Sequence, residues 1–363
     1  MLLKAAVFWE QSGLWIEFAP SWGGLMEQWL AENYFSSRIR IPGPFVQAFL
    51  NFYIEWYHRL GVISGTADGD ETPDGLPIAA HSDDLMRMHY DLPSGLFEAF
   101  LGPSMKYSMG LWESGASNLE EAQAAMMEDL CRKAGIRDGD VILDVGCGFG
   151  SFAGYVLRNY PKATVYGLTL SKVQCDFIRD RQNDLSHPLS TDRFHLLQDD
   201  FNTVSFDRRF DRVVSIGLFE HISNLGKALE KVAGFIKQEG SCFLHYIVFR
   251  KPLNKMGRDS RQDNFFNRYI FPGGRVWFED ALFAHQKYLK IDRSWYLNGS
   301  NYRLTVESWL ANFKRNLAQI RAKTGLDERQ LKIWELYLRA CIGMLHANRG
   351  NYYGNGQYLL TPK

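Results

Sequence analysis

Apolar runs and amphipathic stretches alternate through the middle of this 363-residue chain, and together they predict strands and helices in turn. The stretch 225–240 has helical periodicity and is expected to form a helix that ends at Gly240. Apolar segments with the length of buried strands lie at 141–144, 163–171, 194–200, 210–222 and 241–249, and the fourth segment continues into a turn. Strands that alternate with helices predict parallel βαβ units, in which ligands bind at the carboxyl ends of the strands.

Polar residues that could carry chemistry stand at the expected carboxyl ends of these strands. They are Asp144, Thr169, Asp199, Glu220 and His245. Because the carboxyl ends of parallel strands meet at one edge of a sheet, we expect these side chains to surround one site.

A glycine-rich turn, DVGCGFG over 144–150, follows the first strand. Gly146, Gly148 and Gly150 recur at every second position before a helix-like segment. Glycine lets the backbone approach a ligand where a Cβ would clash, and the helix N-terminus offers free N–H groups. The spacing differs from the dinucleotide pattern G-x-G-x-x-G, and no Lys-Ser/Thr pair for phosphate follows it. The turn resembles the S-adenosylmethionine (SAM) loop of methyltransferases, which predicts a Rossmann-like α/β fold with a mostly parallel, doubly wound sheet.

Composition narrows the class of protein. Lys and Arg together number 41, as do Asp and Glu, so no overall charge favours nucleic acid or an anionic membrane. The five cysteines have no CxxC spacing, which argues against a zinc site or disulfide framework and for free thiols in a reducing compartment. No cleavable signal pattern opens the chain, and no run of about 18 apolar residues could span a bilayer. We therefore expect a cytoplasmic protein with no metal and no nucleic-acid partner.

The chain divides into three parts. Residues 1–62 are rich in aromatic and apolar residues and are expected to be helical, and residues 63–84 have the Gly, Asp and Pro content of a linker. Residues 85–363 form the expected catalytic domain, with its core at about 120–250 and an insertion at 249–280 that would cover the substrate.

Two segments each allow two interpretations. Trp15, Trp22 and Trp29 recur every seven residues, with Trp9 upstream, and on a helix the three would lie on one stripe. The stripe is either a cover for a lipid-like substrate or membrane surface, or the side of a helix packed on the catalytic domain. The basic and aromatic insertion 249–280 either receives an anionic headgroup or is a solvated charged loop.

Seven blocks in order resemble the cyclopropane fatty acid synthase family, which includes mycolic acid methyltransferases and plant coclaurine N-methyltransferases. The resemblance runs from about residue 85 to the last residue. Residues 295–310 are closer to the coclaurine branch, whereas Gly217 stands where the alkaloid enzymes usually carry an extra Glu. The blocks are HYDLPSGLFEAFLGPSMKYSMGLW (89–112), DVGCGFGSFA (144–153), GLTLSKVQ (167–174), GLFEHISN (217–224), LHYI (244–247), NRYIFPGG (267–274) and YRLTVESW (302–309).

The resemblance implies SAM as the cofactor and assigns residues to it. An Asp with three glycines would hold its amino-acid end, and a Tyr-Ser pair would cover its carboxylate, unless that pair is a strand edge without a ligand. Neutral hydroxyl and amide groups after the second strand would bind ribose and adenosine, and a later Asp with its Gln neighbour would bind the adenine amino group. These residues are Tyr107, Ser108, Asp144, Gly146, Gly148, Gly150, Thr169, Ser171, Gln174, Gln198 and Asp199.

The candidate catalytic residues are Glu220, His221, His245 and Tyr302. In cyclopropane synthases, a bicarbonate serves as general base. It is surrounded by the residues matching Glu220, His245 and Tyr302 and by the backbone at the position of Ile247. Bicarbonate is therefore a second cofactor that the resemblance implies. Glu220 beside His221 is also a plausible proton-handling pair without bicarbonate. Met109 stands where the family usually has Cys, and it either supports the anion through its backbone or fills the space of the anion.

Three functions follow from these residues. We favour methylation of an unsaturated carbon in an apolar, lipid-like acceptor, because Gly217, the aromatic N-terminal segment and the basic insertion point that way. The alternative is methylation of a secondary or tertiary amine, and a more distant one is a non-catalytic SAM-binding protein. The expected partner is a small-molecule or lipid acceptor, with peripheral membrane contact and a homodimer left open.

Overall fold

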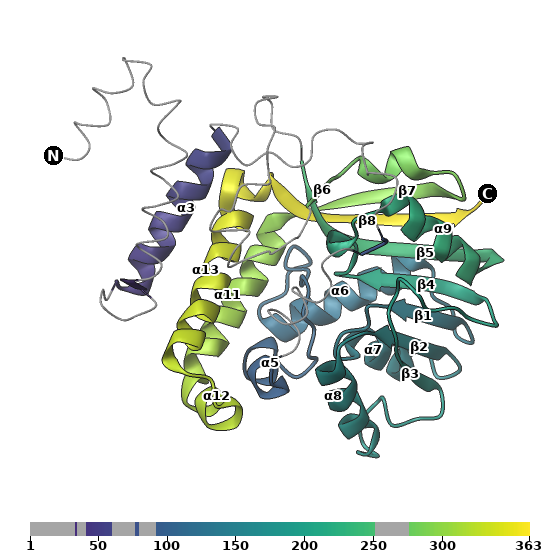
Figure 1. The fold of residues 1–363 in the computed structure, drawn as a ribbon, viewed down its shortest axis with the longest axis horizontal. Coiled ribbons are helices and arrows are strands. Elements are labelled where there is room, and N and C mark those ends of the chain that lie inside the picture. Colours follow the sequence, from purple (N-terminus) through teal and green to yellow (C-terminus); the bar gives the residue numbers. More distant parts are fainter. Residues whose placement is uncertain (1–32, 35–40, 60–76, 80–91, 251–275) are drawn as a thin grey trace.

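The computed structural model describes residues 33–34, 41–59, 77–79, 92–250 and 276–363, which form a central sheet with helices around it (Figure 1). Seven strands pair in the order β3-β2-β1-β4-β5-β8-β7, and β6 pairs with β5 off this path. Strands β1 to β5 are parallel neighbours, whereas β8 runs antiparallel to β5 and β7. The strands are β1 (Val141–Val145), β2 (Thr164–Thr169), β3 (Phe194–Gln198), β4 (Phe210–Ile216), β5 (Ile236–Phe249), β6 (Trp277–Phe278), β7 (Leu289–Asn298) and β8 (Tyr353–Pro362).

Helices α7 (Ser151–Asn159), α8 (Lys172–Gln182) and α9 (Leu225–Phe235) follow β1, β2 and β4 along the chain. Two of them begin at a polar side chain that accepts a hydrogen bond from the first turn, Ser171 for α8 and Asn224 for α9. The alternation of strands and helices confirms the predicted α/β fold with a mostly parallel sheet.

The predicted helix does not extend to Gly240, and this boundary is wrong. Helix α9 ends at Phe235, and β5 begins at Ile236, which pairs with Phe210 and is 1% exposed. A Cβ on Gly240 would lie 2.8 Å from the carbonyl oxygen of Asp211, so the backbones approach closely there. Burial of Ile236 in the sheet outweighs the helical periodicity of residues 236–240.

His245 does not stand at the end of its strand, as the apolar run suggested. It lies four positions before Phe249, the last residue of β5, and pairs with Ile216, the last residue of β4. The strand is longer than its neighbours, so a residue inside it lies level with the carboxyl end of β4.

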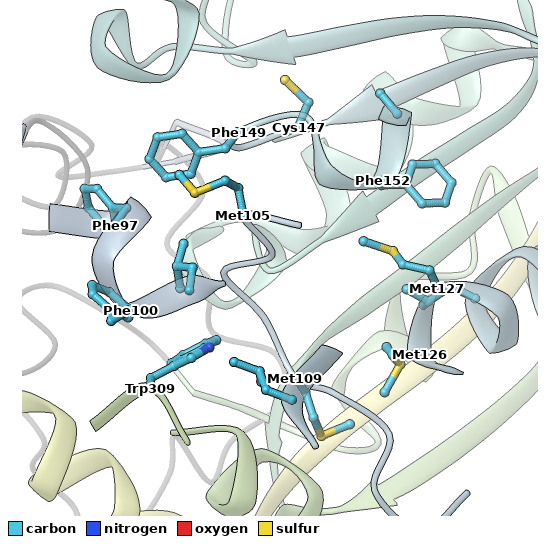
Figure 2. Packing of buried hydrophobic residues seen from close by; sticks show 14 of the residues in the cluster. Phe97, Phe100, Met105, Met109, Met126, Met127, Cys147, Phe149, Phe152 and Trp309 are labelled. Atoms are coloured by element: carbon cyan, nitrogen blue, oxygen red, sulfur yellow. The ribbon is translucent and has the colours of Figure 1, made fainter. Parts of the chain in front are cut away.

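The core lies on both faces of the sheet. One cluster brings together side chains from α5 (Ser94–Leu101), α6 (Leu119–Ala134), α11 (Gly299–Arg315) and α13 (Glu328–Gly350). Figure 2 shows its aromatic side, with Phe97, Phe100 and Trp309, and its opposite side, with Met126, Met127 and Phe152. A second cluster includes the buried side of α9 and residues of β4 and β5.

Helix α3 (Gly43–Arg59) packs beside α13 (Figure 1). Its buried apolar residues are Val46, Leu50 and Ile54. The approach is close, because a Cβ on Gly343 of α13 would lie 2.8 Å from Cδ1 of Ile54. On the other side of α3, Phe45, Phe49 and Phe52 are 69%, 45% and 71% exposed.

Several predicted segments lie wholly or largely outside the described residues. They are the tryptophan stripe of residues 9–29, the linker apart from residues 77–79, and positions 251–275 of the insertion. Within the described ranges, no helix has both the length and the apolar character needed to cross a membrane. All five cysteines are free thiols, as predicted.

Candidate active site

A cavity lies at the carboxyl ends of β1, β2 and β4, where the ligand site was predicted. Predicted residues that line it are Tyr107, Ser108, Asp144, Gly146, Gly148, Thr169, Gln174, Asp199 and His221. Predicted residues that do not line it are Gly150, Ser171, Gln198, Glu220, His245 and Tyr302. The structure therefore brings most of the expected cofactor residues together around one cavity, whereas His221 is the one expected catalytic residue that lines it.

The three glycines of the turn have different surroundings. All three have positive φ, at +81° for Gly146, +57° for Gly148 and +79° for Gly150. A Cβ on Gly146 would lie 3.1 Å from Leu218 Cβ, and one on Gly150 would lie 2.8 Å from Leu189 Cδ1, so a side chain at either position would press on a neighbouring leucine. A Cβ on Gly148 would meet nothing within 4 Å. Because Gly148 lines the cavity, its missing side chain leaves room for a ligand.

Asp144 supplies a buried carboxyl group to the cavity. It is 1% exposed, and its Oδ2 has no hydrogen-bond partner within the described ranges. Burial raises the pKa of Asp144 to about 7. An unsatisfied buried acceptor costs on the order of 1–3 kcal/mol. A ligand that donates a hydrogen bond there, as an ammonium group does, removes this cost.

The polar residues at the end of β2 and in the turn after it have two roles, because some line the cavity and one caps α8. Thr169 Oγ1 donates to Gln174 Oε1 over 2.6 Å, and both residues line the cavity. Ser171 Oγ instead accepts from the Gln174 N–H at 3.3 Å and thereby caps α8. After β3, Gln198 accepts from Arg179 at the surface, whereas Asp199 lines the cavity.

Glu220 lies in a short 3-10 helix, η1 (Phe219–His221), which follows β4. It is 6% exposed, its Oε2 has no hydrogen-bond partner within the described ranges, and burial raises its pKa to about 8. The neighbouring Gly217 N–H donates to the His245 carbonyl oxygen over 2.9 Å. A Cβ on Gly217 would lie 3.7 Å from Glu220 Oε1. Gly217 therefore bonds to the backbone of His245 and lies beside the Glu220 carboxyl group.

The His245 ring is held by two amides from β8. The Gln357 amide nitrogen lies 3.2 Å from Nδ1, and the Asn355 amide lies 3.1 Å from Nε2. Lys133 donates to Gln357 Oε1 over 2.5 Å, so the NH₂ of Gln357 faces Nδ1 and donates to it. Nε2 then carries the hydrogen and faces the Asn355 amide nitrogen. Exchanging the oxygen and nitrogen of this amide would turn Oδ1, which has no partner within the described ranges, toward that hydrogen.

This arrangement keeps the His245 ring neutral. Burial, followed by the charges of Lys106 and Lys133, lowers the pKa of His245 well below its ordinary value. Each ring nitrogen lies within hydrogen-bond distance of a side-chain amide of β8. The ring is therefore better suited to fixing the strand and its neighbours than to taking a proton.

Tyr302 belongs to an aromatic wall that reaches the cavity. Its ring packs edge-on against Trp309 with centroids 6.0 Å apart, and Trp309 lies 5.4 Å from Tyr107. The Tyr107 hydroxyl donates to that of Tyr337 over 3.4 Å. Since Tyr107 also lines the cavity, α11 and α13 contribute to its surroundings through this wall.

Met109 and Lys106 lie behind the cavity in the segment before α6. The Met109 side chain is fully buried in the first core cluster, and its carbonyl oxygen accepts from Lys106 Nζ over 2.6 Å. The sequence reasoning did not select Lys106, Asn355 or Gln357. A lone lysine in the apolar stretch around Met105 and Tyr107 was an available signal for Lys106, whereas the two amides had none.

Comparison with known proteins gives matches over most of the chain. The family model described as mycolic acid cyclopropane synthetase matches residues 79–353. A probable fatty acid methyltransferase of Pseudomonas putida is 32% identical, over 76% of this chain and 69% of its own length. An (S)-coclaurine N-methyltransferase of Papaver somniferum is 27% identical, over 79% of this chain and 82% of its own.

A solved structure also has the same fold. The crystal structure of a coclaurine N-methyltransferase bound to N-methylheliamine and SAH superposes with a TM-score of 0.78 at 22% identity. The match covers 92% of this chain and 98% of the other.

Proposed function

The chain belongs to the mycolic acid cyclopropane synthetase family, and we propose that it transfers a methyl or methylene group from SAM to an unsaturated carbon of an apolar, lipid-like acceptor. The resemblance found in the sequence blocks is thereby confirmed. The protein is a SAM-dependent methyltransferase, as are both kinds of relative. The choice of acceptor is the proposal.

The cavity fits SAM by its own chemistry. SAM supplies a methyl group on a positively charged sulfur, open to attack by an electron pair. The unpaired Asp144 Oδ2 offers an acceptor for its ammonium group, and the space beside Gly148 admits it without a Cβ in the way. Thr169, Gln174 and Asp199 line the same cavity and offer further hydrogen-bonding groups. Alignment of the methyl group with the acceptor then supplies much of the rate.

The observation that carries the acceptor proposal is the uncharged character of the site beyond β4. Glu220 is a carboxyl group whose burial raises its pKa to about 8, so it is mostly protonated at pH 7. Gly217 beside it adds no second acid. Such a site lacks the fixed negative charge that would attract a protonated amine, and an uncharged alkene matches it better.

Glu220 has a role in this reaction. When the alkene forms its new bond to the methyl carbon, the bond from that carbon to sulfur would break, SAH would leave, and the other alkene carbon would become positive. A proton must then leave either the new methyl group, so that a cyclopropane ring closes, or a carbon next to the positive one, so that a double bond forms. Glu220 takes this proton in those molecules in which it is already ionised, a minority at pH 7, and it thereby becomes protonated. Bicarbonate, which the family resemblance implies, would act beside the same group, and its use by this protein stays a prediction.

Methylation of an amine is the second candidate. It is favoured by the Papaver relative, whose match covers more of both chains than that of the Pseudomonas relative. In that reaction an uncharged amine attacks the methyl group, and Glu220 with His221 positions it or takes its proton. The acceptor, of either kind, would be met in the cytoplasm or at a membrane surface, as the sequence predicts.

The test supplies the protein with methyl-labelled SAM and two sets of acceptors. One set holds unsaturated phospholipids and fatty acids, and the other holds secondary and tertiary amines. We expect label on a former alkene carbon, located by mass spectrometry, and its loss in Glu220→Gln. Label in the amines alone would overturn the proposal in favour of the second candidate.

A further inference from the structure

Lys106 is a buried cation whose partners carry no charge. Its side chain is 0% exposed, and Nζ donates to Ser108 Oγ over 2.5 Å and to the Met109 carbonyl oxygen over 2.6 Å. Within the described ranges it forms no ion pair with a carboxylate. Fully buried lysines are rare unless they are paired with an acid.

The surroundings of Lys106 supply no negative charge either. From α6, Gln123 donates to the Lys106 carbonyl oxygen at 3.4 Å, and Lys133 is a second cation acting on the same histidine. From β5, His245 is close enough for the charge of Lys106 to lower its pKa, and it supplies no negative charge. Burial alone lowers the pKa of Lys106 to about 7. A negative charge brought near would stabilise the ammonium form.

The cavity lies on the far side of Ser108. Ser108 lines the cavity with Asp144, whereas Lys106 does not. Because Lys106 Nζ donates to Ser108 Oγ, the serine uses a lone pair for this bond and its own O–H remains able to donate into the cavity. The cavity wall thus contains a carboxyl group, Asp144, whose Oδ2 has no partner within the described ranges. Behind the wall lies the cation of Lys106, which has no acidic partner there and reaches the cavity through the Ser108 hydroxyl group.

An amino-acid group carries both missing charges, one ammonium and one carboxylate. We propose that Lys106 positions the carboxylate of SAM through Ser108: it fixes the serine hydroxyl and supplies the counter-charge, while Asp144 receives the ammonium group. Lys106 is then a positioning residue that touches the cofactor only through Ser108. This inference rests on SAM as the cofactor and not on the acceptor proposed above, so the two can fail separately.

The experiment compares SAM with decarboxylated SAM, which keeps the adenosine, the sulfonium and the amine and lacks the carboxylate. Titration calorimetry on the full chain gives Kd for both ligands. In the wild type, we expect SAM to bind roughly 10-fold to 100-fold more tightly than its decarboxylated analogue, as for a charge-assisted hydrogen bond. In Lys106→Met this preference should fall to about 3-fold or less, because SAM loses affinity and the analogue does not.

Lys133→Met is the matched control, because Lys133 is a partly buried lysine, with a side chain 7% exposed, and it pairs with Asp129 instead. It should keep the wild-type preference for SAM. If Lys106→Met fails to fold by circular dichroism, Ser108→Ala decides, since it removes the hydroxyl relay with a small change at the cavity edge. Equal weakening of both ligands in Lys106→Met, or an unchanged preference in Ser108→Ala, would overturn the inference.

Discussion

Gly148→Ala, compared with a control glycine, tests whether Gly148 is needed to leave space for SAM or only for the left-handed backbone of the turn. A non-glycine residue at φ +57° pays roughly 1–2 kcal/mol for the left-handed backbone. Gly135, at the C-terminus of α6, has φ +66° and likewise nothing within 4 Å of a Cβ. Gly135→Ala therefore carries the same backbone penalty away from the cavity, and both variants should lose about 1–2 kcal/mol of unfolding free energy.

The two variants should differ in SAM affinity. The new methyl group of Gly148→Ala projects into the cavity, where the bound ligand must move or lose contacts. Overpacking by a methyl group costs about 1–3 kcal/mol, which corresponds to a Kd raised roughly 5-fold to 150-fold. Valine should abolish measurable binding. In Gly135→Ala, the Kd for SAM should match that of the wild type.

Calorimetric titration with SAM and SAH gives the affinities, and urea unfolding gives the stabilities. Gly150→Ala provides the converse case, because its Cβ would lie 2.8 Å from Leu189 Cδ1 and would strain the protein core. It should lose more stability than either of the other variants. Equal SAM affinities in Gly148→Ala and Gly135→Ala, with both folded, would refute the assignment of Gly148 to the ligand.

Three further predictions concern Glu220 and α3. Glu220→Gln should lower turnover by roughly 100-fold while the Kd for SAM changes by less than about 3-fold, and wild-type turnover would make the carboxyl group structural. Because burial raises the pKa of Glu220 to about 8 in the folded protein, the folded state keeps a proton that the unfolded chain releases above its ordinary pKa near 4.5. Stability from this group is therefore lost as pH rises from about 4.5 to 8. Glu220→Gln removes this loss, so it should raise Tm at pH 8 more than at pH 5. An equal change of Tm at both pH values would contradict a buried, protonated Glu220. Ile54→Ala, at a fully buried position between α3 and α13, should cost about 2–4 kcal/mol in urea unfolding, whereas a cost below about 1 kcal/mol would show that α3 is not integral to the fold.

The strands of the parallel half could be predicted because each is a short apolar run bounded by polar residues. Asp144 and Thr169 fall at strand ends in the sequence and in the structure. The boundary at Ile236 could not be predicted, since an apolar residue followed by Lys237, Gln238 and Glu239 suits either element. Ile236 begins β5 because it pairs with Phe210 of β4.

The polar support of the site was largely beyond sequence reasoning. Gln357 bonds to His245 across 112 positions of the chain, and the antiparallel placement of β8 brings them together. Local patterns identify the residues that could touch a ligand, whereas the residues that hold them in place depend on long-range topology.

The position of β8 has a consequence for how the protein is made. A ribosome adds residues in chain order, so Tyr353–Pro362 emerge after every other strand of the sheet, yet they lie between β5 and β7. Until then, both neighbours expose unpaired edges that can associate with other chains. His245 also lacks its two amide partners until that moment. Translation that stops before Tyr353 would therefore release a chain with a cofactor turn, no completed site and two open sheet edges, a substrate for chaperones or proteases.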